Sequence, residues 1–239
     1  MKVIGHRGWP ARYPDNSLEG IVAASEVAAM VETDVRRDLA GTLVLSHDPL
    51  VEGPLVEGPL VEGPLVEGPL VEGPLVEGPL AEGEEPLQLA VLLATLPTFP
   101  LNLEIKNFPG EPDFDPDHAT ALRTAELARP FDLLTCFFWP TVDEVHRRFP
   151  DVATGLLVDV GWDLARSARH ALALGHRTLA VHWSLVLATP DVARASAEEG
   201  LALVVWTLND PEYVPKLAEL GVTGIITDDP GAMAAAIQT

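Results

Sequence analysis

The fold is indicated most directly by residues 133–181, LLTCFFWPTVDEVHRRFPDVATGLLVDVGWDLARSARHALALGHRTLAV. Three short apolar runs, 133–137, 152–158 and 178–181, alternate with two helical patterns, 141–149 and 163–174. Apolar runs of this length are typical of buried strands, and the segments between them are long enough for helices. A strand–helix–strand succession predicts parallel strands joined by crossover helices.

The same alternation extends to both ends of the chain. Further strands are predicted at 2–5, 31–35, 42–46, 101–105, 203–206 and 224–227, and further helices near 17–29, 87–96, 117–128, 190–199, 212–220 and 231–237. Eight or nine such units favour a (β/α)8 barrel over an open sheet. Residues 35–42 leave no room for a crossover helix, which normally takes a dozen residues or more. Either that connection is short and irregular, or one predicted strand lies outside the barrel.

A repeat interrupts the alternation. Val-Glu-Gly-Pro-Leu occurs six times in register over residues 51–80, directly after the third predicted strand. Proline at every fifth position is incompatible with a regular helix and removes hydrogen-bond donors from a strand. An extended or irregular surface loop is therefore favoured over stacked turns that bury the Leu-Val pairs. We expect one barrel domain over residues 1–239, with residues 51–80 inserted in it near the mouth of the site.

Charge and composition exclude several classes of protein. The chain of 239 residues has 15 Lys+Arg against 36 Asp+Glu, a formal net charge of −21. Nucleic-acid binding needs a basic face, and an anionic membrane surface would repel this chain. No apolar run reaches the 18 residues of a spanning helix, and no signal-peptide pattern is visible. These features and the single cysteine favour a cytoplasmic location; the oligomeric state stays open.

Acidic residues recur near the ends of the predicted strands, where a barrel carries its reactive groups. Glu32 and Asp34 are two residues apart, so both point to one face of a strand; Glu104 and Lys106 do likewise. Buried carboxylates need a compensating cation. Three carboxylates without a neighbouring cysteine suit a hard ion, Mg²⁺ or Ca²⁺, better than zinc. The sequence therefore predicts one divalent-cation site at Glu32, Asp34 and Glu104.

Basic residues accompany the predicted cation site. Arg7 and Lys106 would hold an anion such as phosphate beside the cation. His6 and His47 follow two other predicted strands, and imidazole can give or take a proton near neutral pH. A cation, a phosphate anchor and two proton carriers together predict phosphodiester cleavage. Each motif alone is more often a solvated or salt-paired face, so their coincidence carries the prediction.

The chain resembles the glycerophosphodiester phosphodiesterases over almost its whole length. The segments that carry the resemblance are Gly5-His6-Arg7-Gly8, Pro14-Asp15-Asn16-Ser17, Glu32-Thr33-Asp34-Val35, Leu43–Asp48, Leu103-Glu104-Ile105-Lys106, Val205–Asn209 and Gly224–Asp228. The resemblance implies a distorted TIM barrel that hydrolyses glycerophosphodiesters to an alcohol and sn-glycerol 3-phosphate, a reaction of glycerol and lipid metabolism. It implies metal ligation by Glu32, Asp34 and Glu104, an acid/base pair His6 and His47, phosphate contacts from Arg7 and Lys106, and a glycerol pocket lined by Trp206.

Two functional alternatives remain open. One is a lysophospholipase D-like or other phospholipase on the same barrel, although no basic amphipathic helix for membrane docking is visible. The other is a non-catalytic glycerophosphodiester-binding protein, which would have no use for paired proton carriers. The resemblance does not decide which histidine is the acid.

Other residues are predicted to be structural. Residues 16–19, Asn-Ser-Leu-Glu, predict a capping box at the first helix. Asp228 could close the barrel mouth or cap the last helix, and the cap is favoured. Cys136 replaces the serine that the family often has there and is expected to be a buried small apolar residue. The five remaining histidines lack metal-ligand spacing and are expected to be surface or structural residues: His118, His146, His170, His176 and His182.

Overall fold

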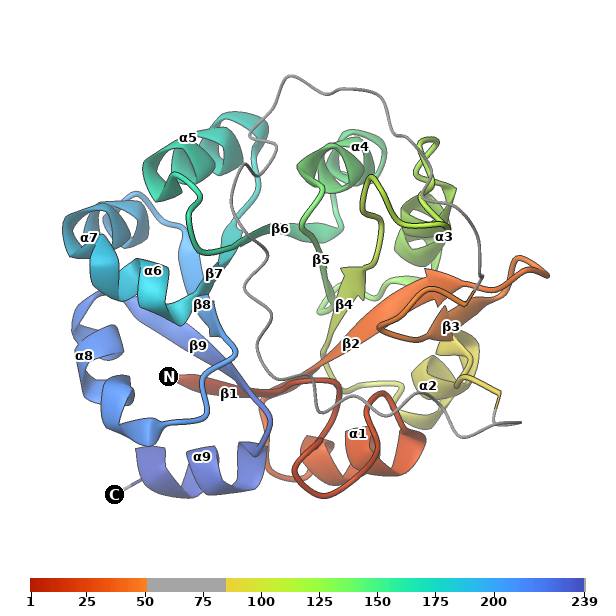
Figure 1. The fold of residues 1–239 in the computed structure, drawn as a ribbon, viewed down its shortest axis with the longest axis horizontal. Helices are drawn as coiled ribbons and strands as arrows, with labels where there is room; N and C mark the ends of the chain where they lie inside the picture. Colours follow the sequence, from red (N-terminus) through yellow and green to blue (C-terminus); the bar gives the residue numbers. More distant parts are fainter. Residues whose placement is uncertain (51–84, 239) are drawn as a thin grey trace.

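Eight parallel strands close into a barrel in the computed structural model, which describes residues 1–50 and 85–238 (Figure 1). The barrel strands are β1 (Lys2–Gly5), β2 (Met30–Arg37), β4 (Leu101–Ile105), β5 (Leu133–Cys136), β6 (Ala153–Val158), β7 (Thr178–His182), β8 (Ala202–Trp206) and β9 (Val222–Thr227). β1 pairs with both β9 and β2, so no barrel strand has an open edge. The predicted TIM barrel is confirmed.

The ninth strand, β3 (Leu43–Leu45), lies outside the barrel. It runs antiparallel to the end of β2, with Val35 opposite Leu45 and Arg37 opposite Leu43. A tight turn joins the two strands, where Gly41 has a φ of +85° and the Asp38 carboxylate accepts the Thr42 N–H at 2.7 Å. Of the two alternatives for residues 35–42, the structure therefore selects a strand outside the barrel.

The repeat at residues 51–80 lies outside the described residues. Its expected place near the site rested on a rule for loops that follow barrel strands. Because β3 is antiparallel, that rule does not apply to it. The place of the repeat near the mouth, which the family resemblance also implies, stays a prediction.

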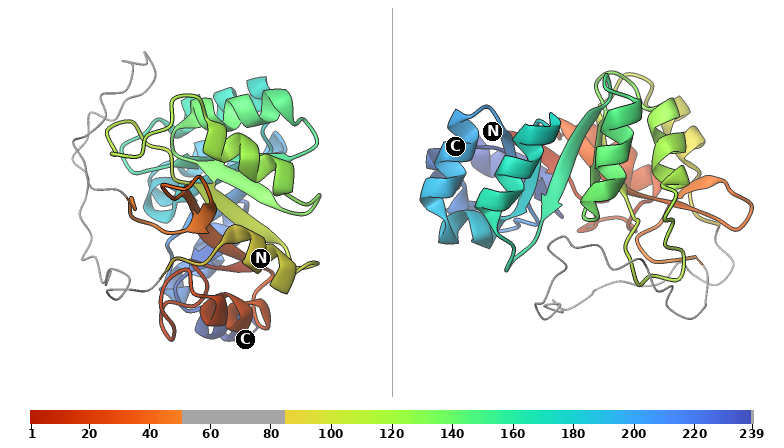
Figure 2. Two further views of the ribbon diagram at one scale, coloured as in Figure 1. Left: turned by 90° about the vertical axis from the view of Figure 1, so that its right-hand side faces the viewer. Right: turned by 90° about the horizontal axis from the view of Figure 1, so that it is seen from above.

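Helices surround the barrel (Figures 1 and 2). They are α1 (Leu18–Ser25), α2 (Leu89–Thr95), α3 (Ala119–Leu127), α4 (Trp139–Arg148), α5 (Leu164–Leu174), α6 (Trp183–Ala188), α7 (Pro190–Glu198), α8 (Val214–Glu219) and α9 (Pro230–Ile237). The sequence predicted all of these except α6. Local signals fix the bounds of α5: the Asp163 carboxylate accepts the Arg166 N–H at its start, and Gly175, with φ of +90°, ends it.

The alternation of side chains along each strand creates two apolar layers. The larger lies between strands and helices and includes Val31, Val35, Leu101, Leu103 and Ile105, all at most 1 % exposed. The smaller fills the barrel interior, with Ile4, Leu157, Ala180, Val204 and Ile226. Polar side chains that point into the barrel therefore lie beyond this apolar interior layer, at the end of the barrel where the parallel strands finish. Among the described residues, no helix has the length and apolar character needed to cross a bilayer.

Candidate active site

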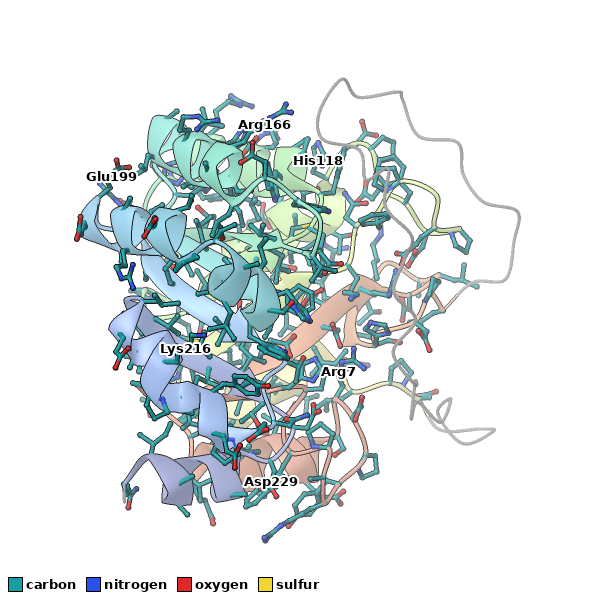
Figure 3. All side chains as sticks on the ribbon, turned by 60° about the vertical axis from the view of Figure 1, so that its left-hand side comes forward. Arg7, His118, Arg166, Glu199, Lys216 and Asp229 are labelled. Carbon is teal, nitrogen blue, oxygen red and sulfur yellow. The ribbon has the colours of Figure 1, made fainter. Side chains whose placement is uncertain are left out.

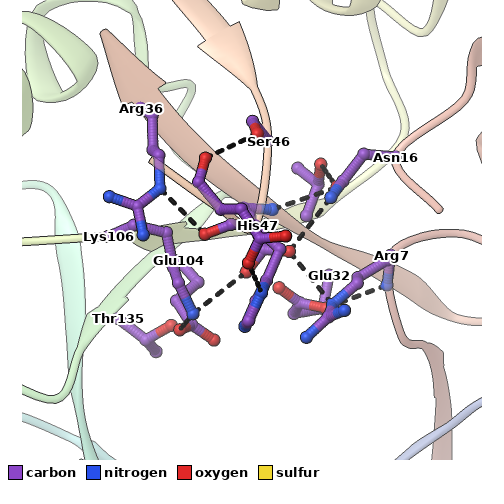
Figure 4. A network of polar contacts seen from close by, with 12 residues as sticks. Arg7, Asn16, Glu32, Arg36, Ser46, His47, Glu104, Lys106 and Thr135 are labelled. Atoms are coloured by element: carbon purple, nitrogen blue, oxygen red, sulfur yellow. Dashed lines mark hydrogen bonds and ion pairs between the residues drawn. The ribbon is translucent and has the colours of Figure 1, made fainter. Parts of the chain in front are cut away.

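Three carboxylates converge at the end of the barrel where the parallel strands finish (Figure 4). β2 and β4 are neighbours although about 65 residues separate them in the sequence, and their register places Asp34 beside Glu104. Glu32 lies two residues before Asp34 and points to the same face. One oxygen from each of the three residues lies within 4.8 Å of the others, and all three are buried.

This cluster fits a divalent cation. Burial, and next the negative charge of Asp34, raise the pKa of Glu32 to about 8. Within the described part of the chain, Oε1 of Glu32 is buried and has no hydrogen-bond partner. An unpaired buried carboxylate oxygen is costly, and a cation would satisfy it. The donor set consists only of oxygen atoms, which hard ions such as Mg²⁺ and Ca²⁺ prefer.

Two basic side chains flank the carboxylates. Nζ of Lys106 lies 2.9 Å from Oε1 of Glu104 and 3.5 Å from Oδ1 of Asp34. Nε of Arg7 lies 3.1 Å from Oδ2 of Asp34, and the Arg7 backbone N–H donates to Oε2 of Glu32 at 2.9 Å. Arg7 has a φ of +48°, a conformation rare for a residue with a side chain, and this turn lets its main chain and its guanidinium reach the same cluster.

The basic and acidic side chains of the cluster shift each other's pKa values. Burial alone would raise the pKa of Asp34, but Lys106 and Arg7 outweigh it and lower that pKa well below its usual range. Burial alone would lower the pKa of Lys106, but Glu104 and Asp34 raise it above its ordinary value. Lys106 therefore stays protonated at neutral pH and offers a fixed cation to an anionic ligand.

His6 follows β1 and is oriented by a residue that sequence reasoning assigned elsewhere. Nδ1 of His6 lies 2.7 Å from Oδ1 of Asp228, after β9, and its Nε2 faces Oε2 of Glu32 at 3.9 Å. Burial alone would lower the pKa of His6, but the Asp228 hydrogen bond and Glu32 outweigh it and raise the pKa. The prediction that Asp228 caps the last helix was wrong, because Asp229 accepts the Ala232 N–H there.

His47 reaches the site from β3, the strand predicted at 42–46, which lies outside the barrel. The Ser46 N–H donates to the carbonyl of Asp34 at 3.1 Å, so the chain returns to the level of the carboxylates. The buried Arg36 donates from Nε to the carbonyl of His47 at 2.8 Å. Nδ1 of His47 lies 3.0 Å from Oδ1 of Asp48. Figure 4 shows His47 between Lys106 and Glu104 on one side and Glu32 and Arg7 on the other.

Asn16 is a second residue whose role the sequence did not reveal. Its predicted place in a capping box was wrong, because Ser17 is the N-cap of α1 and accepts the Gly20 N–H. Asn16 is buried with a φ of +55°. It donates to Oδ2 of Asp34 at 3.0 Å and accepts from the Thr33 hydroxyl at 2.7 Å. The sequence signal for Asn16 was its place in residues 14–17, one of the segments that carry the family resemblance. Asp15 binds Nη1 of Arg7 at 2.9 Å.

Trp206 ends β8 within a group of aromatic rings on the same end of the barrel. Its Nε1–H donates to the carbonyl of Ala180 at 2.9 Å, and its ring packs edge-on against Phe137 at 5.3 Å and His182 at 5.2 Å between centroids. These contacts fix the Trp206 ring as one wall of the mouth. Figure 3 shows Arg7 near the strand ends, whereas Arg166 and Lys216 lie on outer helices.

Comparison with protein families identifies the chain. Residues 6–57 and 112–232 match the model of the glycerophosphoryl diester phosphodiesterase family. The chain belongs to this family. The predicted resemblance and the predicted enzyme class, a glycerophosphodiester phosphodiesterase, are thereby confirmed.

Individual phosphodiesterases are similar to this chain over nearly their whole length. A glycerophosphodiester phosphodiesterase of Caldanaerobacter subterraneus subsp. tengcongensis is 25% identical over 240 residues, covering 95% of this chain and 94% of that protein. The crystal structure of a glycerophosphodiester phosphodiesterase from Thermotoga maritima superposes with a TM-score of 0.72 and 23% identity, covering 98% and 97% of the two chains. An Oleispira antarctica phosphodiesterase, solved with the product sn-glycerol-3-phosphate, gives 0.71 and 21%, covering 100% and 97%. At these sequence identities, the two superpositions show a shared fold and nothing more.

The phosphodiesterase barrel thus gathers the predicted site residues at one end. Direct contacts join His6, Arg7, Glu32, Asp34, Glu104 and Lys106 into one network. His47 stands beside this network on the returning strand, and Trp206 belongs to the aromatic wall of the same mouth. The structure adds Asp228 and Asn16, which hold His6 and Asp34.

Proposed function

We propose that the protein hydrolyses glycerophosphodiesters to an alcohol and sn-glycerol 3-phosphate, using one divalent cation and two histidines. The observation that carries the proposal is the convergence of three buried carboxylates, two cationic side chains and His6 on one end of the barrel. The family match supports the reaction. The product bound to the Oleispira relative supports glycerol 3-phosphate as one of the two products of the reaction.

Glu32, Asp34 and Glu104 would hold the cation, Mg²⁺ or Ca²⁺. When bound, such an ion polarises phosphoryl oxygens and lowers the pKa of a hydroxyl group that contacts it. Glu32, with a pKa of about 8, is largely protonated at neutral pH without the cation, so the other two carboxylates only balance Arg7 and Lys106. A bound cation would displace the Glu32 proton. With a divalent cation the local charge becomes positive by one. That local charge matters because the remainder of the chain is strongly acidic.

Arg7 and Lys106 would stabilise the phosphate during the reaction. Both side chains are already directed by Asp34, so little conformational entropy is lost when an anion binds. Their donors offset the negative charge that grows on the phosphoryl oxygens as the bond to the leaving group breaks. Trp206 would contact the glycerol carbons through its ring face, because its N–H is occupied by the carbonyl of Ala180.

His6 and His47 would move the protons. A carboxylate accepts hydrogen bonds only, so the bond to Asp228 keeps a proton on Nδ1 of His6 and directs Nε2 into the site. One imidazole removes the proton of the nucleophile, which is water or the neighbouring glycerol hydroxyl. The other protonates the leaving alkoxide. The hydroxyl route passes through a cyclic phosphate, and phosphorus NMR after rapid quenching tests for that species.

The deciding experiment measures glycerol 3-phosphate released from soluble diesters, with Mg²⁺ or Ca²⁺, by the wild type and by His6→Ala and His47→Ala. Each substitution should lower turnover by a hundredfold or more. His146→Gln, at the last turn of α4, is the matched histidine control and should keep wild-type turnover. A histidine variant that retains near-wild-type turnover with saturating cation would remove that residue from the mechanism.

Two further measurements separate the alternatives. Glu104→Gln should weaken cation affinity before it changes the fold, and an unchanged titration would exclude Glu104 as a ligand. Faster cleavage of lysolipid than of glycerophosphocholine would favour a phospholipase. Tight binding of diesters without turnover in either cation would favour a binding protein.

A further inference from the structure

A second cluster of ligand-type side chains lies at the other end of the barrel, away from the catalytic mouth. It consists of Asp143 on α4, His170 on α5 and His176, two residues before β7 begins. Thr154, the second residue of β6, touches this cluster. The catalytic residues follow the carboxyl ends of their strands, whereas His176 and Thr154 mark the amino ends of theirs. The cluster therefore forms a separate site.

The donor atoms of the cluster already have the spacing of metal ligands. Nε2 of His176 lies 2.8 Å from Oδ1 of Asp143, and Nε2 of His170 lies 3.0 and 3.1 Å from its two oxygens. In a tetrahedral site with bonds of about 2.0–2.1 Å, neighbouring donors are about 3.3 Å apart. An ion therefore requires each imidazole nitrogen to move away from the Asp143 carboxylate by only a few tenths of an ångström. One ligand atom of each residue lies within 4.8 Å of the other two, so the histidines would also approach each other around the ion.

The rings are held by groups behind them. Nδ1 of His176 lies 2.7 Å from the Thr154 hydroxyl, and the His176 side chain is completely buried. His170 packs against the ring of Trp139, with 5.1 Å between centroids. Partners of this kind fix ring orientation in metal sites. The side chains of Asp143 and His170 are 24 % and 32 % exposed, which gives an ion a path from solvent.

We propose that Asp143, His170 and His176 bind one zinc-class divalent ion, with the fourth position open to water. Two imidazoles and one carboxylate select Zn²⁺ or Co²⁺ over Mg²⁺ and Ca²⁺, which prefer oxygen donors. The all-oxygen cluster at the catalytic end and this histidine cluster would therefore prefer different cations. The bound ion would join α4, α5 and the segment before β7.

The proton balance of binding follows from the hydrogen bonds. In the ion-free structure the Asp143 carboxylate only accepts, so each Nε2 carries a proton. Binding through Nε2 displaces that proton, which moves to Nδ1 of the same ring. Nδ1–H of His176 then donates to the Thr154 hydroxyl, which reverses the direction of that bond without breaking it.

The test is a Co²⁺ titration of the purified full-length protein in excess Mg²⁺, followed by the visible absorption of imidazole-bound Co²⁺. The wild type should bind one equivalent at this site. Glu104→Gln should give the same band, which separates the result from any failure of the proposed catalytic site. His170→Ala should abolish the band, and His118→Asn, a half-buried histidine outside the cluster, should retain it. No band in the wild type, or an equal band in His170→Ala, would overturn the proposal.

A second measurement does not depend on absorption. Zn²⁺ at about a hundredfold excess over its Kd should raise the Tm of the wild type by roughly 5–10 °C. His170→Ala should show no rise, and its partly exposed side chain makes this variant compatible with folding. Thr154→Val should fold and weaken Zn²⁺ affinity by about 10–100-fold, because it removes the group that orients His176. Equal Zn²⁺ affinity in Thr154→Val would exclude that orienting role.

Discussion

Replacement of Asp228 by asparagine should impair catalysis without moving the backbone. Oδ1 of Asp228 lies 2.7 Å from Nδ1 of His6, and Oδ2 accepts from the side-chain amide of Asn209. An asparagine with its oxygen toward His6 keeps that acceptor, loses the negative charge and places its own amide N–H beside Asn209. A hydrogen bond to a charged group contributes about 1.5–3 kcal/mol. Asp228 is 36 % exposed, so the lower part of that range applies. At about 1.4 kcal/mol per factor of ten, we expect turnover to fall roughly ten- to thirtyfold.

The pH profile of the same variant assigns the proton transfers. The Asp228 bond opposes burial and raises the pKa of His6, so Asp228→Asn should lower that pKa. Whichever limb of the kcat profile His6 governs should move to lower pH. A shift of the acid limb identifies His6 as the base, because a base must be deprotonated, and a shift of the alkaline limb identifies it as the acid.

The assay couples glycerol 3-phosphate release to a dehydrogenase and runs over the pH range of the stable protein. Asp229→Ala is the matched control, because Asp229 caps α9 and does not contact His6. It should lose about 2–4 kcal/mol of stability, because it removes the α9 cap and also the acceptor of the indole N–H of the buried Trp9, which donates to Asp229 at 3.0 Å. It should keep its kcat. Wild-type turnover with unmoved limbs in Asp228→Asn would refute the orienting role of Asp228.

Three further predictions concern the frame of the site. Asn16→Ala leaves the Thr33 hydroxyl and the Asp34 N–H without their buried partner, so thermal denaturation should show a loss of about 2–3 kcal/mol; an unchanged Tm contradicts this. Burial raises the pKa of Cys136 to about 12, so the native protein should not react with a thiol reagent at pH 8, whereas the denatured protein should react with one equivalent; reaction in the native state would show that the barrel opens. We also expect deletion of residues 56–80 to leave Tm and kcat unchanged, because the described strands close the barrel without them; a lower kcat at equal Tm would give the repeat a role in the reaction.

Local pattern was sufficient for most elements of the barrel. All nine strands lie where apolar runs predicted them, because each run is buried on at least one side and periodicity reports burial directly. The missed helix, α6, has only six residues and follows β7 without a break in its apolar pattern, so periodicity could not separate the two. The position of strand β3 was predicted correctly. Its antiparallel direction was not, because direction depends on the hairpin turn and an apolar run does not indicate it.

Neighbouring residues of similar type could not be told apart from the sequence. Asp228 and Asp229 are both suited to cap a helix, yet a shift of one residue turns one side chain to His6 and the other to Ala232. His170 and His176 are six apart, which is no ligand spacing on a helix. Gly175 reverses the chain between them with a φ of +90°, and His176 returns to the Asp143 carboxylate.

The sequence by itself determined the order of strands and helices, the barrel class, and which residues carry charge at strand ends, since these follow from periodicity and residue chemistry along the chain. Only the tertiary structure decided that β2 and β4 are neighbours, that Asp34 faces Glu104, and that Asp228 reaches His6 across the closure of the barrel. The contact of Asp34 with Glu104 arises from the pairing of β2 with β4, and that of Asp228 with His6 from the closure of the barrel by β1 and β9. Closure depends on pairing between segments far apart in the chain, and no local pattern encodes that pairing.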